Sequence, residues 1–306
     1  MPRDWRRLAQ YAVARVVGLT VLSGLTALGP GSFGAASAAP STTKPRAKAT
    51  TKAPTVTTSV AFTVDLQVRL PQSYAFALRG AGQADFAHRD VSLSFNLPTA
   101  GLHSSAIGKG VPRATGSLLL QGEWVDGTAY VKVPASLTAL AGGAQNLSYA
   151  VPAATARQVD TAIDQSAVAL TYTHLLIDTL AGHQSRHNMG SRSIGGVPAT
   201  GTQIDLTLSQ LLKVIPGLIP AMTKDIGKMA DTKIPATIWV DAGGRLVEAS
   251  MGSSAKTALG TITGSVQFSN YNAPVSIAAP PAGEVRPVSK SELALLEAAN
   301  PFGAKR

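Results

Sequence analysis

The sequence of 306 residues contains no cysteine. Disulfides, thiol nucleophiles, cysteine-ligated zinc and iron–sulfur clusters are therefore excluded, and so is lipid attachment through an N-terminal cysteine. Aromatic residues are also few, at 5% of the chain, but hydrophobic residues make up 45% of it. The chain can therefore build a substantial core, and that core is mainly aliphatic.

Charged residues are scarce, at 14% of the chain against about 25% in typical soluble proteins. The net charge of +10 is concentrated near the N-terminus: residues 1–39 contribute +3, residues 40–57 contribute +4, and only +3 remains for residues 58–306. A nucleic-acid-binding domain would carry its basic residues on the folded part of the chain. The charge distribution therefore argues against nucleic acid as a partner.

Catalytic signatures are absent from the sequence. It contains no G-x-S-x-G elbow, no G-x-G-x-x-G after a predicted strand, no P-loop and no H-E-x-x-H. His183 and His187 have the spacing of two metal ligands on one helix face, but they follow Gly182 in a polar stretch, where a solvated loop is the simpler interpretation. We therefore expect a non-enzymatic protein without catalytic residues, cofactor or metal.

Residues 1–39 have the three parts of an export signal: an arginine-bearing start, an apolar middle at residues 13–28, and Ala36-Ser37-Ala38 as a cleavage site. An uncleaved membrane anchor is the alternative. The uninterrupted apolar stretch after Arg15 is short against the ~20 residues needed to span a bilayer. We therefore predict a cleaved signal peptide and an exported protein.

Residues 40–57 are rich in Thr, Ala, Pro and Lys and show no apolar period. Such a segment cannot bury enough surface to offset its ordering entropy, and we predict a flexible linker. Two roles are open for it. It is either a solvated spacer or a weak contact with an anionic membrane surface through its four cations, Lys44, Arg46, Lys48 and Lys52.

Residues 58–288 are predicted to form one domain of the α+β class. Apolar residues alternate with polar ones over residues 60–70, which indicates a half-buried strand, and residues 74–78 are interpreted as its continuation after Pro71. A second alternating run follows at residues 84–97. Three strand pairs with turn residues between them predict hairpins at residues 118–133, 192–206 and 234–251. Two more strands are predicted at residues 257–269 and 275–278, before Pro280-Pro281 ends the sheet.

Two apolar runs with helical spacing are expected to cover this sheet. The first extends from about residue 154 to Gly182, and the second covers residues 206–229, where apolar residues recur every three or four positions. Pro216 and Pro220 must kink or divide the second run. Residues 289–306 are predicted to form a short C-terminal helix and tail, with Ser289 and Glu292 spaced as a capping box.

Four strings in the sequence resemble the lipoprotein-carrier superfamily of the LolA and LolB type, in its actinobacterial branch typified by LppX and LprG. They are GEWVDGTAYVKV at residues 122–133, GVPATGT at 196–202, IPATIWVDAGGRL at 234–246 and YNAPVSI at 271–277. The third is the most specific. Together the strings extend over most of residues 58–281.

The resemblance implies an incomplete, half-open antiparallel β-barrel wrapped on α-helices, with an apolar cavity that takes acyl chains. It implies no covalent chemistry. It also implies a role in moving lipids or lipidated molecules across the cell envelope, where a transport protein would be a further partner. Many members of that branch carry a lipobox cysteine, which this chain lacks, so we expect an extracellular or envelope protein without a lipid anchor.

The leading hypothesis is therefore an exported carrier that binds lipid or another acylated ligand between the sheet and the helices. The alternative is an envelope interaction module with the same fold and a filled core; an apolar void of several hundred Å³ would favour the carrier. The expected cavity lining consists of apolar residues on the two helical runs: Val159, Ile163, Leu208, Leu211, Leu212, Ile215, Ile219, Met222 and Ile226.

Overall fold

The computed structural model describes nine stretches of the chain. The predicted signal peptide and C-terminal helix lie outside them, as do most of the predicted linker and residues 208–229 of the helical run predicted at residues 206–229. The described residues are 55–69, 75–98, 117–133, 143–151, 153–174, 177–178, 186–207, 233–252 and 261–288.

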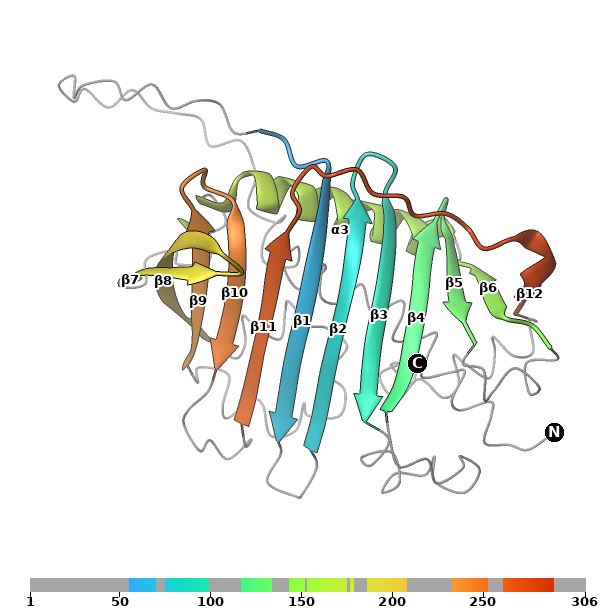
Figure 1. Cartoon of the computed structure of the whole chain (residues 1–306), viewed down its shortest axis with the longest axis horizontal. Coiled ribbons are helices and arrows are strands. Elements are labelled where there is room, and N and C mark those ends of the chain that lie inside the picture. The colour runs from blue at the N-terminus through green and yellow to red at the C-terminus, as the bar shows by residue number, and fades with distance from the viewer. Residues whose placement is uncertain are drawn as a thin grey trace.

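Twelve strands form one sheet in the order β12-β6-β5-β4-β3-β2-β1-β11-β10-β9-β8-β7 (Figure 1). All neighbouring pairs are antiparallel except β12 with β6. The edge strands β7 and β12 are not paired with each other, so the sheet is open. The predicted α+β class with a half-open antiparallel sheet agrees with this arrangement. The strands are β1 Ser59–Arg69, β2 Ala75–Asp85, β3 Asp90–Pro98, β4 Ser117–Val125, β5 Thr128–Lys132, β6 Asn146–Ala150, β7 Arg186–Ile194, β8 Val197–Thr207, β9 Lys233–Asp241, β10 Leu246–Gly252, β11 Thr261–Ser269 and β12 Val285–Pro287.

Strand β1 lies near the middle of the sheet, between β2 and β11. Its residues Val60, Phe62 and Val64 are buried, while Thr63 between them is exposed. Alternate side chains of a strand point to opposite faces, so one face of β1 is apolar and packed. The predicted strand at residues 60–70 is confirmed.

The interpretation of residues 74–78 as a continuation of β1 is wrong. Residues 75–78 belong to a separate strand, β2, which runs antiparallel to β1 and pairs Val60 with Ala84 and Phe62 with Gly82. The sequence did not indicate the part of this strand between residues 78 and 84, because two of its inward positions, Gly80 and Gly82, have no side chain and erase the apolar alternation.

The predicted hairpin turns are confirmed. Asp126 and Gly127 join β4 to β5 and both have positive φ, 47° and 73°. Gly195 and Gly196 join β7 to β8. In the β9–β10 turn the Asp241 carboxylate accepts hydrogen bonds from the backbone N–H groups of Gly243 and Arg245, at 2.8 and 2.9 Å. The short polar side chain of Asp241 thus stabilises a tight turn within the string at residues 234–246, the most specific of the four.

The chain after β11 differs from the prediction. Residues 275–278 are extended but form no strand, and β12 follows Pro280-Pro281 and pairs in parallel with β6. Alternate residues, Ala273, Val275 and Ile277, are partly buried. Figure 1 shows this segment crossing the sheet on the face opposite to α3. The five-residue strand β6 was also not predicted, because it follows a run of glycines and is too short to show a period.

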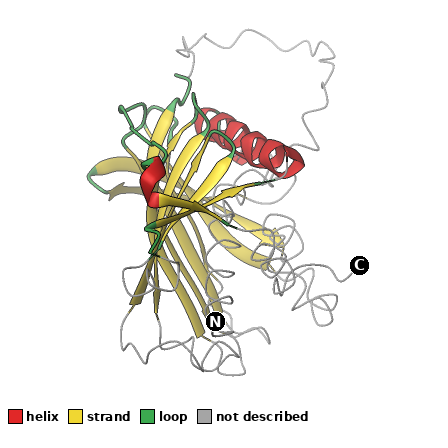
Figure 2. Cartoon of the chain, turned by 90° about the vertical axis from the view of Figure 1, so that its right-hand side faces the viewer, coloured by secondary structure: helices red, strands yellow, loops and turns green. Residues whose placement is uncertain are grey.

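The long helix of the described part is α3, Ala153–Thr171, which crosses several strands on one face of the sheet (Figures 1 and 2). Its buried positions Val159, Ile163, Ser166 and Leu170 recur every four, three and four residues, which is one helix face. Among the described residues, no helix is both long enough and apolar enough to cross a bilayer.

Candidate functional site

The inner face of the sheet, defined as the face that packs against α3, is apolar over most of its strands. Its buried residues come from β1 to β5 and from β8 to β11 and form one cluster with α3. They include Val60, Phe62, Val64, Ala84, Val91, Leu93, Phe95, Trp124, Ala129, Ile204, Leu206, Ala236, Ile238, Leu246 and Phe268. This face carries the candidate site.

Two phenylalanine rings lie over the backbone of β2. A Cβ atom added to Gly82 would lie 2.5 Å from Cζ of Phe62, and one added to Gly80 would clash with the ring of Phe95. Because β2 has no side chains at these positions, the rings of its neighbours β1 and β3 occupy that area of the inner face. The two glycines therefore shape this part of the site.

Two of the predicted lining residues, Val159 and Ile163, lie on α3 and are 7% and 0% exposed. The structure brings both together with the inner face, in the same apolar cluster. The other seven predicted lining residues, between Leu208 and Ile226, lie outside the described residues. Their assignment as cavity lining stays a prediction.

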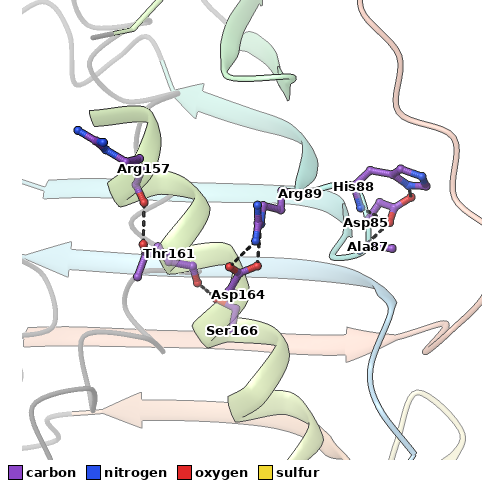
Figure 3. A network of polar contacts seen from close by, with 9 residues as sticks. Asp85, Ala87, His88, Arg89, Arg157, Thr161, Asp164 and Ser166 are labelled. Carbon is purple, nitrogen blue, oxygen red and sulfur yellow. Dashed lines mark hydrogen bonds and ion pairs between the residues drawn. The ribbon is translucent and has the colours of Figure 1, made fainter. Parts of the chain in front are cut away.

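Polar contacts fix α3 at one end of the sheet (Figure 3). The guanidinium of Arg89, in the β2–β3 turn, donates two hydrogen bonds to the Asp164 carboxylate, at 2.9 and 3.0 Å. Near the end of the helix, the backbone N–H of Thr57 donates to Oγ1 of Thr171 at 2.9 Å. Thr57 lies two residues before β1, and Arg89 lies in the turn that follows β2, so both attachments lie at the same end of these antiparallel strands.

Two buried hydroxyl groups, one in α3 and one just after it, bond to the helix backbone. Ser166 donates to the carbonyl of Ala162 at 2.8 Å, and Thr173 donates to that of Leu170 at 3.2 Å. Such local bonds supply a buried hydroxyl with an acceptor from its own helix. The helix can therefore pack against an apolar face with these groups buried.

The titratable groups lie mainly at the turns and on the outer face. The His88 imidazole, bonded to the Asp85 carboxylate at 2.8 Å, has a raised pKa because of that bond. Burial raises the pKa of Asp90, whose Oδ1 atom has no hydrogen-bond partner in the structure. Burial also raises the pKa of the Tyr271 hydroxyl, which donates to the carbonyl of Leu246.

These titratable groups do not form a metal-binding cluster in the described part of the chain. No three acidic, histidine or cysteine side chains there are grouped closely enough to hold a metal ion. His187, one of the two histidines considered as ligands, is exposed on the edge strand β7, and His183 lies outside the described residues.

A second cluster, on the outer face, was not predicted. The Arg192 guanidinium lies 4.1 Å from the centroid of the Trp239 ring and is 2.5 Å from a carboxylate oxygen of Glu248. The other Glu248 oxygen accepts a hydrogen bond from Gln267 at 3.0 Å. These residues come from β7, β9, β10 and β11, and only the strand order brings them together. The sequence alone gave no signal for this grouping.

Fold and site together define an open, mainly antiparallel sheet with one apolar face packed on a helix. No family model and no curated protein matches the sequence. Among solved structures, LprF from Mycobacterium bovis is 14% identical with a TM-score of 0.42, over 87% of this chain and 97% of that one. Lipoprotein LppX from Mycobacterium tuberculosis is 13% identical with a TM-score of 0.38, over 72% and 90%.

A LolA superfamily protein from Nitrosomonas europaea is 10% identical with a TM-score of 0.23, over 76% of this chain and 91% of that one. LppX and the LolA superfamily are both named in the resemblance drawn from the sequence strings. These identities and TM-scores are low. The ligand therefore has to be inferred from this chain's own residues.

Proposed function

We propose that the protein is an exported, non-enzymatic carrier that binds lipid or another acylated molecule between the inner face of the sheet and its helices. The single observation that supports this most is the extent of the apolar inner face. By register, β1 places apolar residues at four successive inward positions, from Val60 to Leu66. At about 3.3 Å per residue, these positions cover about 20 Å.

One helix is too narrow to cover this face. An α-helix with its side chains is about 10 Å wide, and the contacts of Arg89 and Thr57 hold α3 near one end of the strands. Farther along the strands, Leu66 and Met251 remain only partly buried on the inner face. The predicted helical run at residues 208–229 would cover this area, and acyl chains would lie between that run and the sheet. Each buried methylene would contribute about 0.8 kcal/mol.

The location follows from the N-terminal sequence. We propose that residues 1–39 direct export and are removed, and that the protein works in the envelope or outside the cell without a lipid anchor, since no cysteine is present to carry one. An envelope transport protein would load or receive the cargo.

One observation favours the interaction module with a filled core. Phe95, Leu206 and Ile234 lie on the inner face beyond the residues nearest to α3, and each is at most 6% exposed. A fully packed interior would bury them in the same way. The two functions therefore differ in whether the inner face accepts an acyl chain.

Binding of a fluorescent fatty acid to Met251→Trp tests the proposal. Met251 lies on the inner face at its partly buried end, and the larger ring would fill space that the acyl chain needs. We expect affinity to fall by about tenfold or more. Met189→Trp is the matched control, because Met189 is exposed on β7, and it should bind like the wild type.

Leu212→Asp tests the proposed lining from the helical run and should abolish uptake, whereas Lys256→Asp should not. Unchanged uptake by both inner variants would rule out this site. Absence of uptake by the wild type would favour the interaction module.

A further inference from the structure

One carboxylate organises the turn between β2 and β3. Asp85, the last residue of β2, accepts hydrogen bonds from the backbone N–H groups of Ala87 and His88, at 3.0 and 3.2 Å. Its other oxygen bonds to the His88 ring at 2.8 Å. An aspartate that bonds to the residues just after it stabilises a tight turn. The conformation of this turn therefore depends on the Asp85–His88 pair.

The same turn holds α3. Arg89 directly follows His88, and its guanidinium donates two hydrogen bonds to the Asp164 carboxylate in the middle of the helix (Figure 3). The φ angle of Arg89 is +62°, a left-handed conformation that costs free energy in any residue with a side chain. Such a conformation persists only while its surroundings hold it. The contact between Arg89 and α3 therefore depends on the turn that the Asp85–His88 pair stabilises.

Carboxylates face this corner of the structure from each element packed there. They are Asp85 on β2, Asp90 on β3, Asp126 in the β4–β5 turn, and Asp160 and Asp164 on α3. The hydrogen bond to Asp85 raises the pKa of the His88 imidazole most, and the charges of Asp90 and Asp126 raise it further. A protonated His88 thus offsets the mutual repulsion of these three carboxylates, and its deprotonation removes that compensation.

We propose that His88 is a pH-sensitive switch for α3: its protonated ring keeps the turn folded and the helix closed over the inner face, and its deprotonation lets the helix open more readily. The direction follows from linkage. Because the folded turn raises the pKa of His88, its stabilising effect is fully present below the ordinary pKa of 6.5. The effect is lost as the pH rises through the folded pKa.

This inference rests on the proposed carrier function, because opening of α3 matters for a ligand held on the inner face. It adds a condition for release: the ligand leaves faster when the pH rises above the folded pKa of His88. The His88 side chain is 74% exposed, so its ring exchanges protons with the surrounding solvent while the helix is closed.

A titration of the His88 imidazole by NMR tests the coupling between ring and helix in the full protein. Asp164→Asn removes the hydrogen bonds to Arg89, whereas the matched control Asp160→Asn removes a carboxylate that acts on Arg89 by charge alone. We expect the pKa of His88 to fall more in Asp164→Asn than in Asp160→Asn, because an unattached turn opens more often and the ring then loses Asp85. Equal shifts in both variants, or none, would overturn the proposal.

Release of a pyrene-labelled monoacylglycerol tests the consequence, since this acyl ligand has no titrating group. Its dissociation rate from the wild type should rise by about two- to fivefold between pH 6 and pH 8. His88→Gln, always uncharged, should release it at the faster rate at both pH values, and His88→Lys, always charged, at the slower rate. The other histidines are the same in all three proteins. An equal pH dependence in the wild type and His88→Gln would contradict the switch.

The two measurements separate failure of the switch from failure of the carrier function. A wild type that binds no monoacylglycerol at either pH contradicts the carrier function, and the NMR titration then decides whether His88 and α3 are coupled. A wild type that binds the ligand and releases it at the same rate at both pH values contradicts the switch alone.

Discussion

Arg89 and Asp164 are joined by two hydrogen bonds, of 2.9 and 3.0 Å, between the β2–β3 turn and the middle of α3. Both side chains are about half exposed, so the pair contributes at most about 1 kcal/mol. Its geometric role is larger. Together with the bond from Thr57 to Thr171, it determines the end of the inner face on which the helix lies.

Substitutions of Arg89 should separate the ion pair from the backbone. Arg89 has φ of +62°, a conformation that glycine adopts without strain. Arg89→Ala loses the pair and keeps the strain, whereas Arg89→Gly loses the pair and relieves it. We expect Arg89→Gly to be more stable than Arg89→Ala by about 1 kcal/mol in urea unfolding. If Arg89→Ala were the more stable of the two variants, the left-handed backbone conformation of Arg89 would be contradicted.

Gly82→Ala should destabilise the domain by about 1–3 kcal/mol, because the new methyl group would clash with the Phe62 ring and with the carbonyl of Ser92. Gly252→Ala is the matched control on another strand, since its Cβ would find its nearest neighbour at 3.8 Å. Thermal unfolding of both variants measures the difference. Equal losses would mean that Phe62 does not lie over β2.

Asn272→Ala should loosen the start of the domain without unfolding it. The substitution removes the bonds to Thr58 N–H and to the Val56 carbonyl, both at exposed positions. We expect faster hydrogen exchange at Thr57 and Thr58, while the amides in the middle of β1 remain protected. In Asn270→Ala, these two amides should exchange at the wild-type rate. If they stay protected in Asn272→Ala as well, Asn272 does not hold this segment.

Asp90→Asn should change the dependence of stability on pH. Burial raises the pKa of the Asp90 carboxyl above its ordinary value of 3.8, so the folded state prefers the protonated form. The stability from this preference is fully present below the unfolded pKa and is lost as the pH rises through the folded pKa. The variant should therefore gain stability over the wild type at pH 7 and lose that advantage at pH 3. An advantage that grows on acidification would contradict this assignment.

How much of the fold could be predicted depended on the side chains at inward positions. Strand β1 has a branched or aromatic residue at each of these positions, and its alternation was sufficient. Strand β2 has Gly80 and Gly82 there, so the half of the strand that contains them could not be recognised. Strand β12 has three residues and follows two prolines, and only its pairing with β6 makes it a strand.

The part of the candidate site that lies on α3 could be predicted, because the spacing of its apolar residues is visible in the sequence. Val159 and Ile163 were predicted from their four-residue spacing and lie against the inner face. The contact of Arg89 with Asp164 joins residues 75 positions apart, and the grouping of Trp239 with Arg192 depends on the strand order. No local pattern encodes such contacts, because they arise from the topology of the sheet.

Native mass spectrometry of the protein purified from its own envelope, followed by organic extraction and lipid analysis, tests the central claim most directly. The account predicts a stoichiometric acylated passenger that is lost in Met251→Trp and retained in Met189→Trp. An empty wild-type protein that also fails to take up added lipid would contradict it, and the inner face would then be an ordinary filled core.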